Sequence, residues 1–140
     1  MNYLLDTCVL AELVKPNPNS KVIDWITDTD DEKLFLSVIT IGEIRKGLTK
    51  LPESKKKKTL SNWLNKLLED YQTRIYQINI MVAENWGIIQ GSAEKSGTPI
   101  SSVDSLIAAV AYTHNLTLVT RNEKDFIPSN VPIINPWSEI

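Results

Sequence analysis

Short runs of hydrophobic residues alternate along the chain with longer segments in which hydrophobic positions recur every three or four residues. The short runs are typical of buried strands, and the longer spacing is typical of amphipathic helices. The pattern therefore predicts strands at residues 3–6, 33–37, 74–78, 116–120 and 131–135. Helices are predicted between them, at residues 7–15, from 20, at 40–51, 53–71 and 79–97, and from 102 onward.

Strands that are separated by helices form a parallel sheet, because the chain must cross over between neighbouring strands. We therefore expect a three-layer α/β/α sandwich with a short, mostly parallel central sheet. The 140 residues contain no stretch that resembles a linker, and this length is usual for one domain. The prediction is a single domain over residues 1–140.

Composition and charge exclude several classes of protein. With 42% hydrophobic and 23% charged residues the chain is neither disordered nor fibrous, and a net charge of −2 gives no overall basic field. The single cysteine, Cys8, cannot form an internal disulfide, and no Cys/His spacing predicts zinc. No apolar stretch approaches the roughly 20 residues of a membrane span, and the N-terminus lacks a secretory signal. We expect a soluble, cytoplasmic protein without a membrane partner.

Four acidic residues lie near the predicted ends of strands. Asp6 ends the first strand, and Glu43 lies a few residues beyond the second. Asp104 is in the first turn of the helix that precedes strand 116–120, and Asp125 follows that strand, with Asn122 nearer to it. Because ligands bind where parallel strands end, these side chains are predicted to converge on one edge of the domain.

Each acid taken alone has a structural explanation, and for a single residue that explanation is favoured. Thr40 and Glu43 have the spacing of a capping box, as do Ser101 and Asp104, while Asp6 could cap its helix. As a set, however, converging carboxylates repel one another unless a cation compensates them. Oxygen ligands without His or Cys select Mg²⁺ or Mn²⁺, ions that support hydrolysis of phosphodiesters. The residues alone predict a metal-dependent phosphodiesterase.

Several stretches of the chain also match a known family. The stretches are "YLLDTCVLAEL", "LSVITIGEIRKGL", "GTPISSVDSLIAAVAYTHNLTLVTRNEKDF" and the short "I-N-P-W" close to the end. With these motifs the chain resembles the PIN-domain nucleases, and most closely the VapC-like toxins of bacterial toxin–antitoxin pairs. The resemblance covers essentially the whole sequence.

The resemblance implies an Mg²⁺- or Mn²⁺-dependent endoribonuclease that acts as a toxin. Carried over by position, Asp6, Glu43 and Asp104 are the metal-binding acids. The fourth acidic position falls at Asp125 in some relatives and at Asn122 in others, and we favour Asp125. Two hydroxyls, those of Thr7 and Thr120, match positions that support the site. The family further implies a homodimer, a small VapB-like antitoxin that silences the site, and contact with DNA only through the antitoxin complex.

Basic residues near the acids are candidates for holding RNA. Arg45, Lys46 and Arg121 are close in sequence to the acids and could bind the RNA backbone or a product phosphate. The lysine run 55–58 is either a patch for RNA phosphates or a solvated helix face. The apolar stripes of helices 40–51 and 53–71 suit either contact with another chain or an intramolecular helical hairpin.

Two other functions compete with the nuclease. A phosphatase of the haloacid-dehalogenase type also has an aspartate after its first strand, usually in a D-x-D motif, but here Cys8 stands two residues after Asp6. A non-catalytic module that acts at DNA together with its partner would retain only a vestigial metal site. The presence of all the expected acids argues against lost activity.

Overall fold

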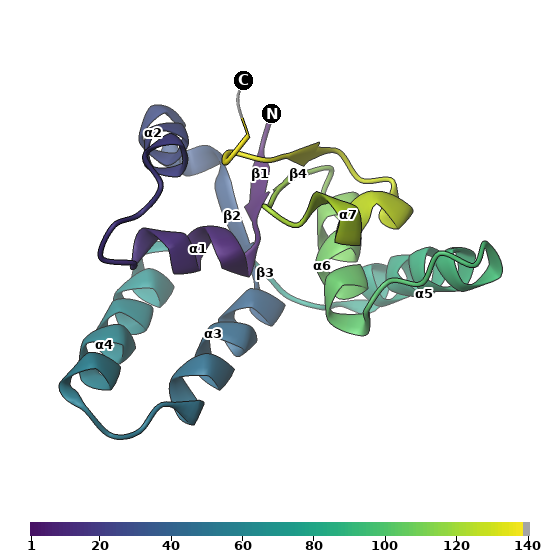
Figure 1. Ribbon diagram of the computed structural model, residues 1–140. Helices are drawn as coiled ribbons and strands as arrows, with labels where there is room; N and C mark the ends of the chain where they lie inside the picture. The colour runs from purple at the N-terminus through teal and green to yellow at the C-terminus, as the bar shows by residue number, and fades with distance from the viewer. Residues whose placement is uncertain (139–140) are drawn as a thin grey trace.

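The computed structural model describes residues 1–138 and places a five-stranded sheet at the centre of the molecule (Figure 1). All strand pairs are parallel, and the strand order is β3-β2-β1-β4-β5. The strands are β1 (Tyr3–Leu5), β2 (Leu34–Ser37), β3 (Ile75–Tyr76), β4 (Thr117–Val119) and β5 (Ile133–Ile134). The central position of β1 places the residues after it between the ends of β2 and β4.

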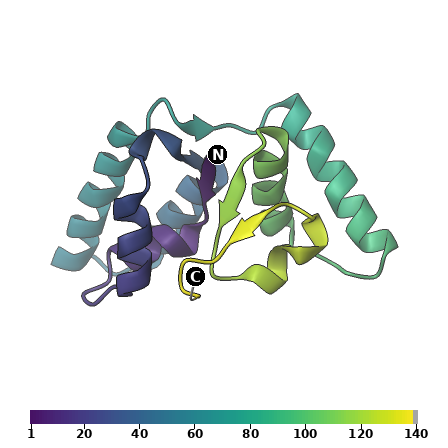
Figure 2. The same cartoon turned by 90° about the horizontal axis from the view of Figure 1, so that it is seen from above.

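Helices cover both sides of this sheet. On one side lie α1 (Thr7–Leu13), α2 (Ser20–Asp28), α3 (Val38–Lys50) and α4 (Lys55–Asp70). On the other side lie α5 (Ile80–Lys95), α6 (Ser102–Thr113) and α7 (Glu123–Phe126), and 3₁₀ turns occur at Asp31–Lys33 and Ile127–Ser129. Figure 1 and Figure 2 show the two helical layers from perpendicular directions. The predicted three-layer sandwich with a parallel sheet is confirmed.

The two helical layers enclose two separate cores, and the pleat of the strands divides them. Leu4 and Leu118 pack with α5 and α6 in one core, whereas Leu5 and Val119 pack with α1, α3 and α4 in the other. All four side chains are fully buried, as expected when successive residues of a strand point to opposite faces. Within residues 1–138, no helix is long and apolar enough to cross a membrane.

The predicted start of the second helix at residue 20 is confirmed, but the predicted start of α3 at residue 40 is wrong, since the helix begins at Val38. Asn79 and Ser101 cap α5 and α6 as expected. The second helix is capped by Asn19 rather than Ser20, because the Asn19 side chain accepts hydrogen bonds from the first turn. Helix α3 is capped by Ser37, not by Thr40. The capping-box explanation of Glu43 is therefore wrong, since Glu43 lies in the second turn of the helix.

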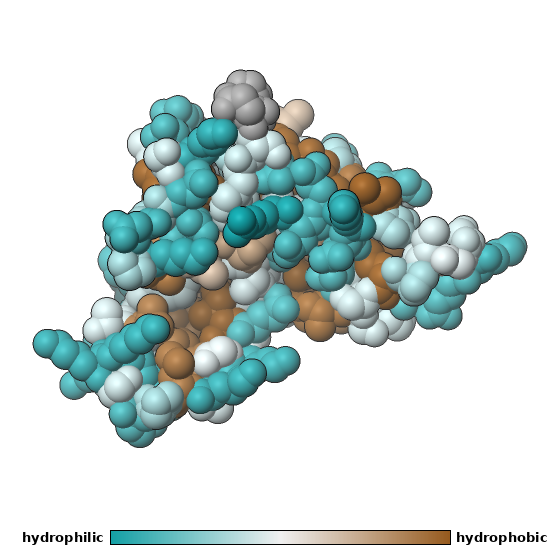
Figure 3. All heavy atoms as spheres, in the orientation of Figure 1, coloured by the Kyte–Doolittle hydropathy of each residue, from teal (hydrophilic) through white to brown (hydrophobic). Residues whose placement is uncertain are grey.

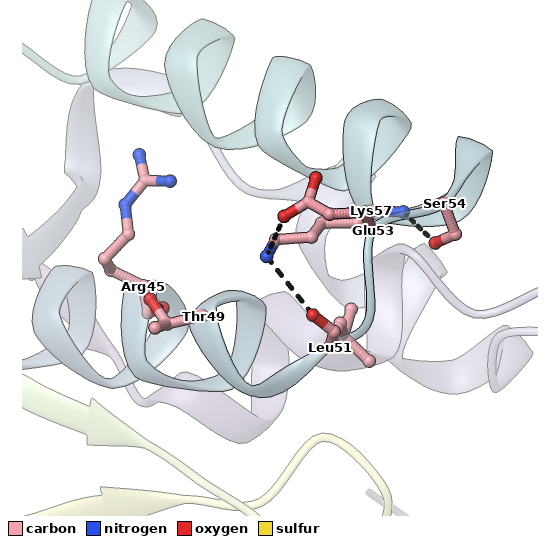
Figure 4. Close-up of polar contacts among 6 residues, drawn as sticks. All are labelled: Arg45, Thr49, Leu51, Glu53, Ser54 and Lys57. Atoms are coloured by element: carbon pink, nitrogen blue, oxygen red, sulfur yellow. Dashed lines mark hydrogen bonds and ion pairs between the residues drawn. The ribbon is translucent and has the colours of Figure 1, made fainter.

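Helices α3 and α4 form an intramolecular hairpin that buries Leu48, Leu64 and Leu67. At its turn, the Nζ of Lys57 donates hydrogen bonds to the Leu51 carbonyl at 3.2 Å and to Glu53 Oε1 at 2.9 Å (Figure 4). Within the lysine run 55–58, Lys57 therefore stabilises the turn between α3 and α4.

Candidate active site

Asp6 occupies the centre of the edge where the parallel strands end. It follows β1 directly and caps α1, with Oδ1 accepting a hydrogen bond from the Thr7 amide at 2.8 Å. Its other oxygen, Oδ2, accepts from the Thr120 hydroxyl at 2.7 Å and from the Cys8 thiol at 3.6 Å. Only 5% of Asp6 is exposed, and all its donors are uncharged. Burial raises the pKa of this carboxyl above its ordinary value, and the nearby charge of Glu43 adds to the rise.

Glu43 reaches the same edge from α3. Its Oε1 accepts a hydrogen bond from the Thr7 hydroxyl at 2.5 Å. Thr7 therefore connects the two acids, because its backbone amide bonds Asp6 and its side chain bonds Glu43. Thr7 and Thr120, which are predicted to support the site, each donate a hydrogen bond to one of its acids.

Asp104 approaches from the first turn of α6. The Ser101 hydroxyl caps this helix by accepting a hydrogen bond from the Asp104 amide at 3.1 Å. The pKa of Asp104 is raised mainly by burial, and then by the negative charges of Asp6, Asp125 and Glu43. The structure thus brings all four predicted acids into one electrostatic neighbourhood.

The fourth position has two residues close together. Asp125 is exposed in the short helix α7, and its amide donates to the Asn122 carbonyl at 3.1 Å. The Asn122 amide donates to the Thr120 hydroxyl at 3.0 Å, which ties Asn122 to the Asp6 side of the site. Asp125 adds negative charge near Asp104, whereas Asn122 is held beside Thr120 by its backbone amide.

The chemistry of these donors fits a hard cation. Among the described residues, Lys15, Lys57 and Lys66 form ion pairs with Glu12, Glu53 and Asp70, and none of these pairs involves the four acids. Four carboxylates with only neutral donors leave negative charge that a divalent cation would compensate. In the same described residues, no three Asp, Glu, His or Cys side chains are yet close enough to hold an ion.

Residues 3–127 match the family model of the PIN domain. The chain belongs to the PIN-domain family. PIN-domain ribonucleases are generally metal-dependent, in agreement with the acidic edge described above. Family membership does not favour the phosphatase alternative.

Named relatives are similar to this chain over almost its whole length. The chain is 36% identical over 137 residues to Toxin FitB of Neisseria gonorrhoeae, covering 97% of this chain and 99% of that protein. It is 33% identical over 135 residues to VapC ribonuclease Y4jK of Sinorhizobium fredii, with 96% of each covered. Among solved structures, FitAB bound to an IR36 DNA fragment superposes with a TM-score of 0.94 at 34% identity, covering 99% and 97%. These relatives are a toxin, a ribonuclease and a complex on DNA.

The predicted basic residues of this PIN domain all lie on the surface. Arg45 and Lys46 are exposed on α3, and Figure 4 shows the Arg45 side chain extending away from its helix. Arg121 is exposed after β4, where its guanidinium lies 5.5 Å from the centre of the Trp137 ring. Its backbone amide also donates a hydrogen bond to the Cys8 sulfur at 3.4 Å, so the backbone of Arg121 lies beside the acidic edge.

Sequence reasoning missed three residues that contact the site. Cys8 bonds Asp6, while Ser37 and Thr40 lie behind Thr7. The only sequence signal for them was position, since all three follow directly after a strand or stand within the next helical turn. His114, which we did not place in the site, stacks on Tyr76 with ring centres 3.6 Å apart.

Proposed function

We propose that residues 1–140 act as a single PIN-like nuclease domain, a metal-dependent endoribonuclease that serves as the toxin of a toxin–antitoxin pair. The observation that carries the proposal is the edge of four carboxylates that have no basic partner within residues 1–138, in a family that includes the named ribonuclease and toxin relatives. We expect this activity in the cytoplasm, because the proposed substrate is RNA.

The ion that we propose is Mg²⁺ or Mn²⁺, because every candidate ligand is an oxygen. Asp6, Glu43 and Asp104 would hold it, and Asp125 would join them directly or through water. Asn122 is the second candidate for that fourth position. When bound, such an ion lowers the pKa of a coordinated water and takes up charge on the phosphate.

The side chains of the chain itself orient this site and hold the substrate. Thr120 and Thr7 fix the directions of the Asp6 and Glu43 carboxylates by hydrogen bonds at 2.7 and 2.5 Å. We assign Arg45, Lys46 and Arg121 to the RNA backbone, because they are exposed cations close in sequence to the acids. No side-chain nucleophile is required.

The decisive experiment uses purified protein and total RNA, with and without Mn²⁺ and EDTA. Wild-type protein should cleave with Mn²⁺ and stop in EDTA, and Asp104→Asn should cleave at least about a hundredfold more slowly. Asp70→Asn is the matched control, because Asp70 pairs with Lys66 on the surface of α4. Cleavage by Asp104→Asn at the wild-type rate would show the assignment to be wrong.

The fourth position has its own comparison within the same assay. If Asp125 contributes to the ion, Asp125→Asn should raise the Mn²⁺ concentration needed for cleavage more than Asn122→Ala does. The opposite order would move the assignment to Asn122.

A groove beside the site fits the expected antitoxin. Helices α1, α3 and α4 line a mostly apolar cavity of about 330 Å³ that includes Thr7 and Glu43 at one end. It shares Val14, Lys56 and Leu60 with a second cavity of about 720 Å³, so the two form one groove. Figure 3 shows apolar surface between α3 and α4. We propose that an amphipathic segment of the antitoxin occupies this groove and ends at the acids.

Gly47 allows a test of the groove because open space surrounds the position of a Cβ there. Gly47→Leu should weaken inhibition by the antitoxin while RNA cleavage by the free protein persists. Lys50→Leu is the control, since Lys50 is an exposed residue of the same helix outside the groove. Equal inhibition of the two variants would exclude the groove as the binding surface.

Two further partners belong to this proposal. A homodimer needs an apolar surface, and α5 exposes Ile80, Met81 and Ile88 at 84%, 63% and 65%. DNA contact would come through the antitoxin complex, as supported by the likeness to FitAB on DNA.

A further inference from the structure

Helices α5 and α6 lie side by side in one layer (Figure 1), and a hydrogen bond joins them near each end of α6. Near the N-terminus of α6, Trp86 Nε1 donates to the Ser105 hydroxyl at 2.9 Å. Near its C-terminus, the side-chain amide of Asn85 donates to the Thr113 hydroxyl at 2.8 Å. The first of these bonds lies beside the acidic edge, because Ser105 directly follows Asp104.

The direction of each hydrogen bond at Ser105 is fixed by the chemistry of its partners. An indole N–H only donates, so the Ser105 oxygen accepts from Trp86. The Ser105 hydroxyl gives its own proton to the carbonyl of Ser101, at 2.9 Å, or of Ser102, at 3.1 Å, because carbonyls only accept. Ser105 is fully buried, so bulk water does not compete for these contacts. The indole therefore holds the first turn of α6 through Ser105.

A second side chain of α5 holds the residue that precedes this turn. Gln90 Nε2 donates to the carbonyl of the buried Ile100 at 3.1 Å. Gln90 follows Trp86 by four residues, so both side chains lie on the same face of α5. The next residue, Ser101, caps α6 by accepting a hydrogen bond from the Asp104 amide at 3.1 Å. The chain on both sides of Asp104 is thus joined to α5 by hydrogen bonds.

These contacts set the rotation of α6 about its axis, and with it the direction of Asp104. Successive residues of a helix are about 100° apart around the axis, so Ser105 facing α5 leaves Asp104 facing a different side. On that side Asp104 meets the negative charges of the other three acids. Alanines 108, 109 and 111 form only shallow ridges in the packing of α6, so polar contacts have more influence on its rotation.

We propose that Trp86 and Gln90 are positioning residues that orient Asp104 through the first turn of α6. The proposal rests on the proposed function, because Asp104 is assigned there to the metal ion. Both residues act through the backbone of α6, so their effect is smaller than that of losing the Asp104 carboxylate.

The test compares the two ends of α6. Trp86→Phe removes the indole N–H and keeps an aromatic ring, and Gln90→Met removes the amide at nearly constant length. Asn85→Ala is the matched control, because it removes a hydrogen bond between the same two helices at the far end of α6. The readouts are the Mn²⁺ concentration that gives half of the maximal cleavage rate, the separate kcat and KM for RNA, and the thermal midpoint.

Trp86→Phe and Gln90→Met should each raise the half-saturating Mn²⁺ concentration about tenfold, as for other residues that orient metal ligands. They should lower kcat about tenfold and keep KM within about twofold, because a displaced ligand slows the chemical step. Asn85→Ala should lower the thermal midpoint similarly and keep the Mn²⁺ requirement within about twofold of wild type. A wild-type Mn²⁺ requirement in either test variant removes that residue from the role, and an equal shift in Asn85→Ala overturns the proposal.

Hydrogen exchange in EDTA gives a second test that needs neither metal nor RNA. Trp86→Phe should speed exchange of the Ser105 amide, which bonds the Ser101 carbonyl, about fivefold, as expected for the loss of one hydrogen bond. Asn85→Ala should instead speed exchange of the His114 amide at the other end of α6. Unchanged exchange at Ser105 overturns the proposal. If the wild type cleaves no RNA but shows this exchange pattern, the proposed function is refuted and the hold of α5 on the first turn of α6 stands.

Discussion

The two ends of helix α1 each hold a buried carboxylate, and the two have opposite surroundings. Asp6 and Glu12 are both 5% exposed. At Glu12, the Lys15 ammonium at 2.8 Å and the Asn19 amide at 2.8 Å lower the pKa of the carboxyl, with Lys15 the larger cause. At Asp6, burial raises the pKa, and the nearest charge is another acid.

The difference separates a structural acid from a functional one. Glu12 is compensated by a lysine three residues away, so its charge stabilises the fold and needs nothing further. Asp6 is buried with neutral donors only, so its charge is unfavourable for the fold until a cation arrives. Burial alone therefore does not identify a functional carboxylate. Burial without an opposite charge within the described residues is what supports the proposed role of Asp6 as a metal ligand.

The largest expected effect comes from neutralising each acid in turn. Asp6→Asn should reduce Mn²⁺-dependent RNA cleavage by more than about a hundredfold, because it removes a proposed ligand. Glu12→Gln should cleave RNA within about twofold of wild type, since Glu12 lies outside the acidic edge. Initial cleavage rates at saturating Mn²⁺ measure both. Similar losses of RNA cleavage in the two variants would show that Asp6 and Glu12 do not differ in function.

Stabilisation of the protein by added metal should depend on Asp6 and not on Glu12. At a hundred times the dissociation constant, an ion that binds only the folded state adds about 2.7 kcal/mol to the free energy of unfolding. Urea titrations with Mn²⁺ and with EDTA should show this gain in wild type and in Glu12→Gln. The gain should be lost in Asp6→Asn, and its retention there would remove Asp6 from the ion site.

The two acids should also respond to pH in opposite directions in EDTA. The folded pKa of Asp6 lies above its ordinary 3.8, so its ionisation destabilises the fold above that folded pKa. This destabilisation is relieved as pH falls through the raised pKa toward 3.8. The folded pKa of Glu12 lies below its ordinary 4.5, so its stabilisation is present above 4.5 and is lost as pH falls through the lowered pKa.

Thermal midpoints of wild type, Asp6→Asn and Glu12→Gln between pH 7 and pH 3 separate these responses. The advantage of Asp6→Asn over wild type should shrink on acidification above pH 3.8, and the disadvantage of Glu12→Gln should shrink below 4.5. Parallel curves for the two variants would contradict the assignment.

The smallest effect is expected from Lys15→Met, which removes the partner of Glu12 and keeps the length of the side chain. It should lower the thermal midpoint slightly, because half of Lys15 is exposed and its charge is screened by solvent. RNA cleavage should not change. A loss of cleavage would show that the compensated end of α1 also influences the site.

The fold and the place of Asp6 at the sheet edge could be predicted because they depend on local patterns. Strand-to-helix alternation gave the parallel sheet, and the position of Asp6 after β1 placed it at the sheet edge. The start of α3 could not be predicted, because Val38 and Ile39 are β-branched residues that resemble the preceding strand. The Ser37 cap is visible only in the structure.

The hydroxyl groups of the site were harder to predict than the acids. Thr7 and Thr40 are 33 residues apart, and Cys8 and Thr120 are 112 apart. Contacts over such separations leave no periodicity in a single sequence. Nor could the sequence distinguish Glu12, which has a partner, from Asp6, which lacks one.

The pairing of β1 with β4 sets the time at which the site can form during synthesis. The Asp6 carboxylate receives its hydrogen bond from Thr120, which is 114 residues later in the chain. At about 5–20 residues per second, a ribosome takes about 6–23 s to cover that interval. Throughout it, the nascent chain has Asp6 but lacks Thr120 and β4, so the acidic edge is unformed. In a nuclease with this topology, the translating ribosome and the mRNA are therefore not exposed to a formed active site until that interval has passed.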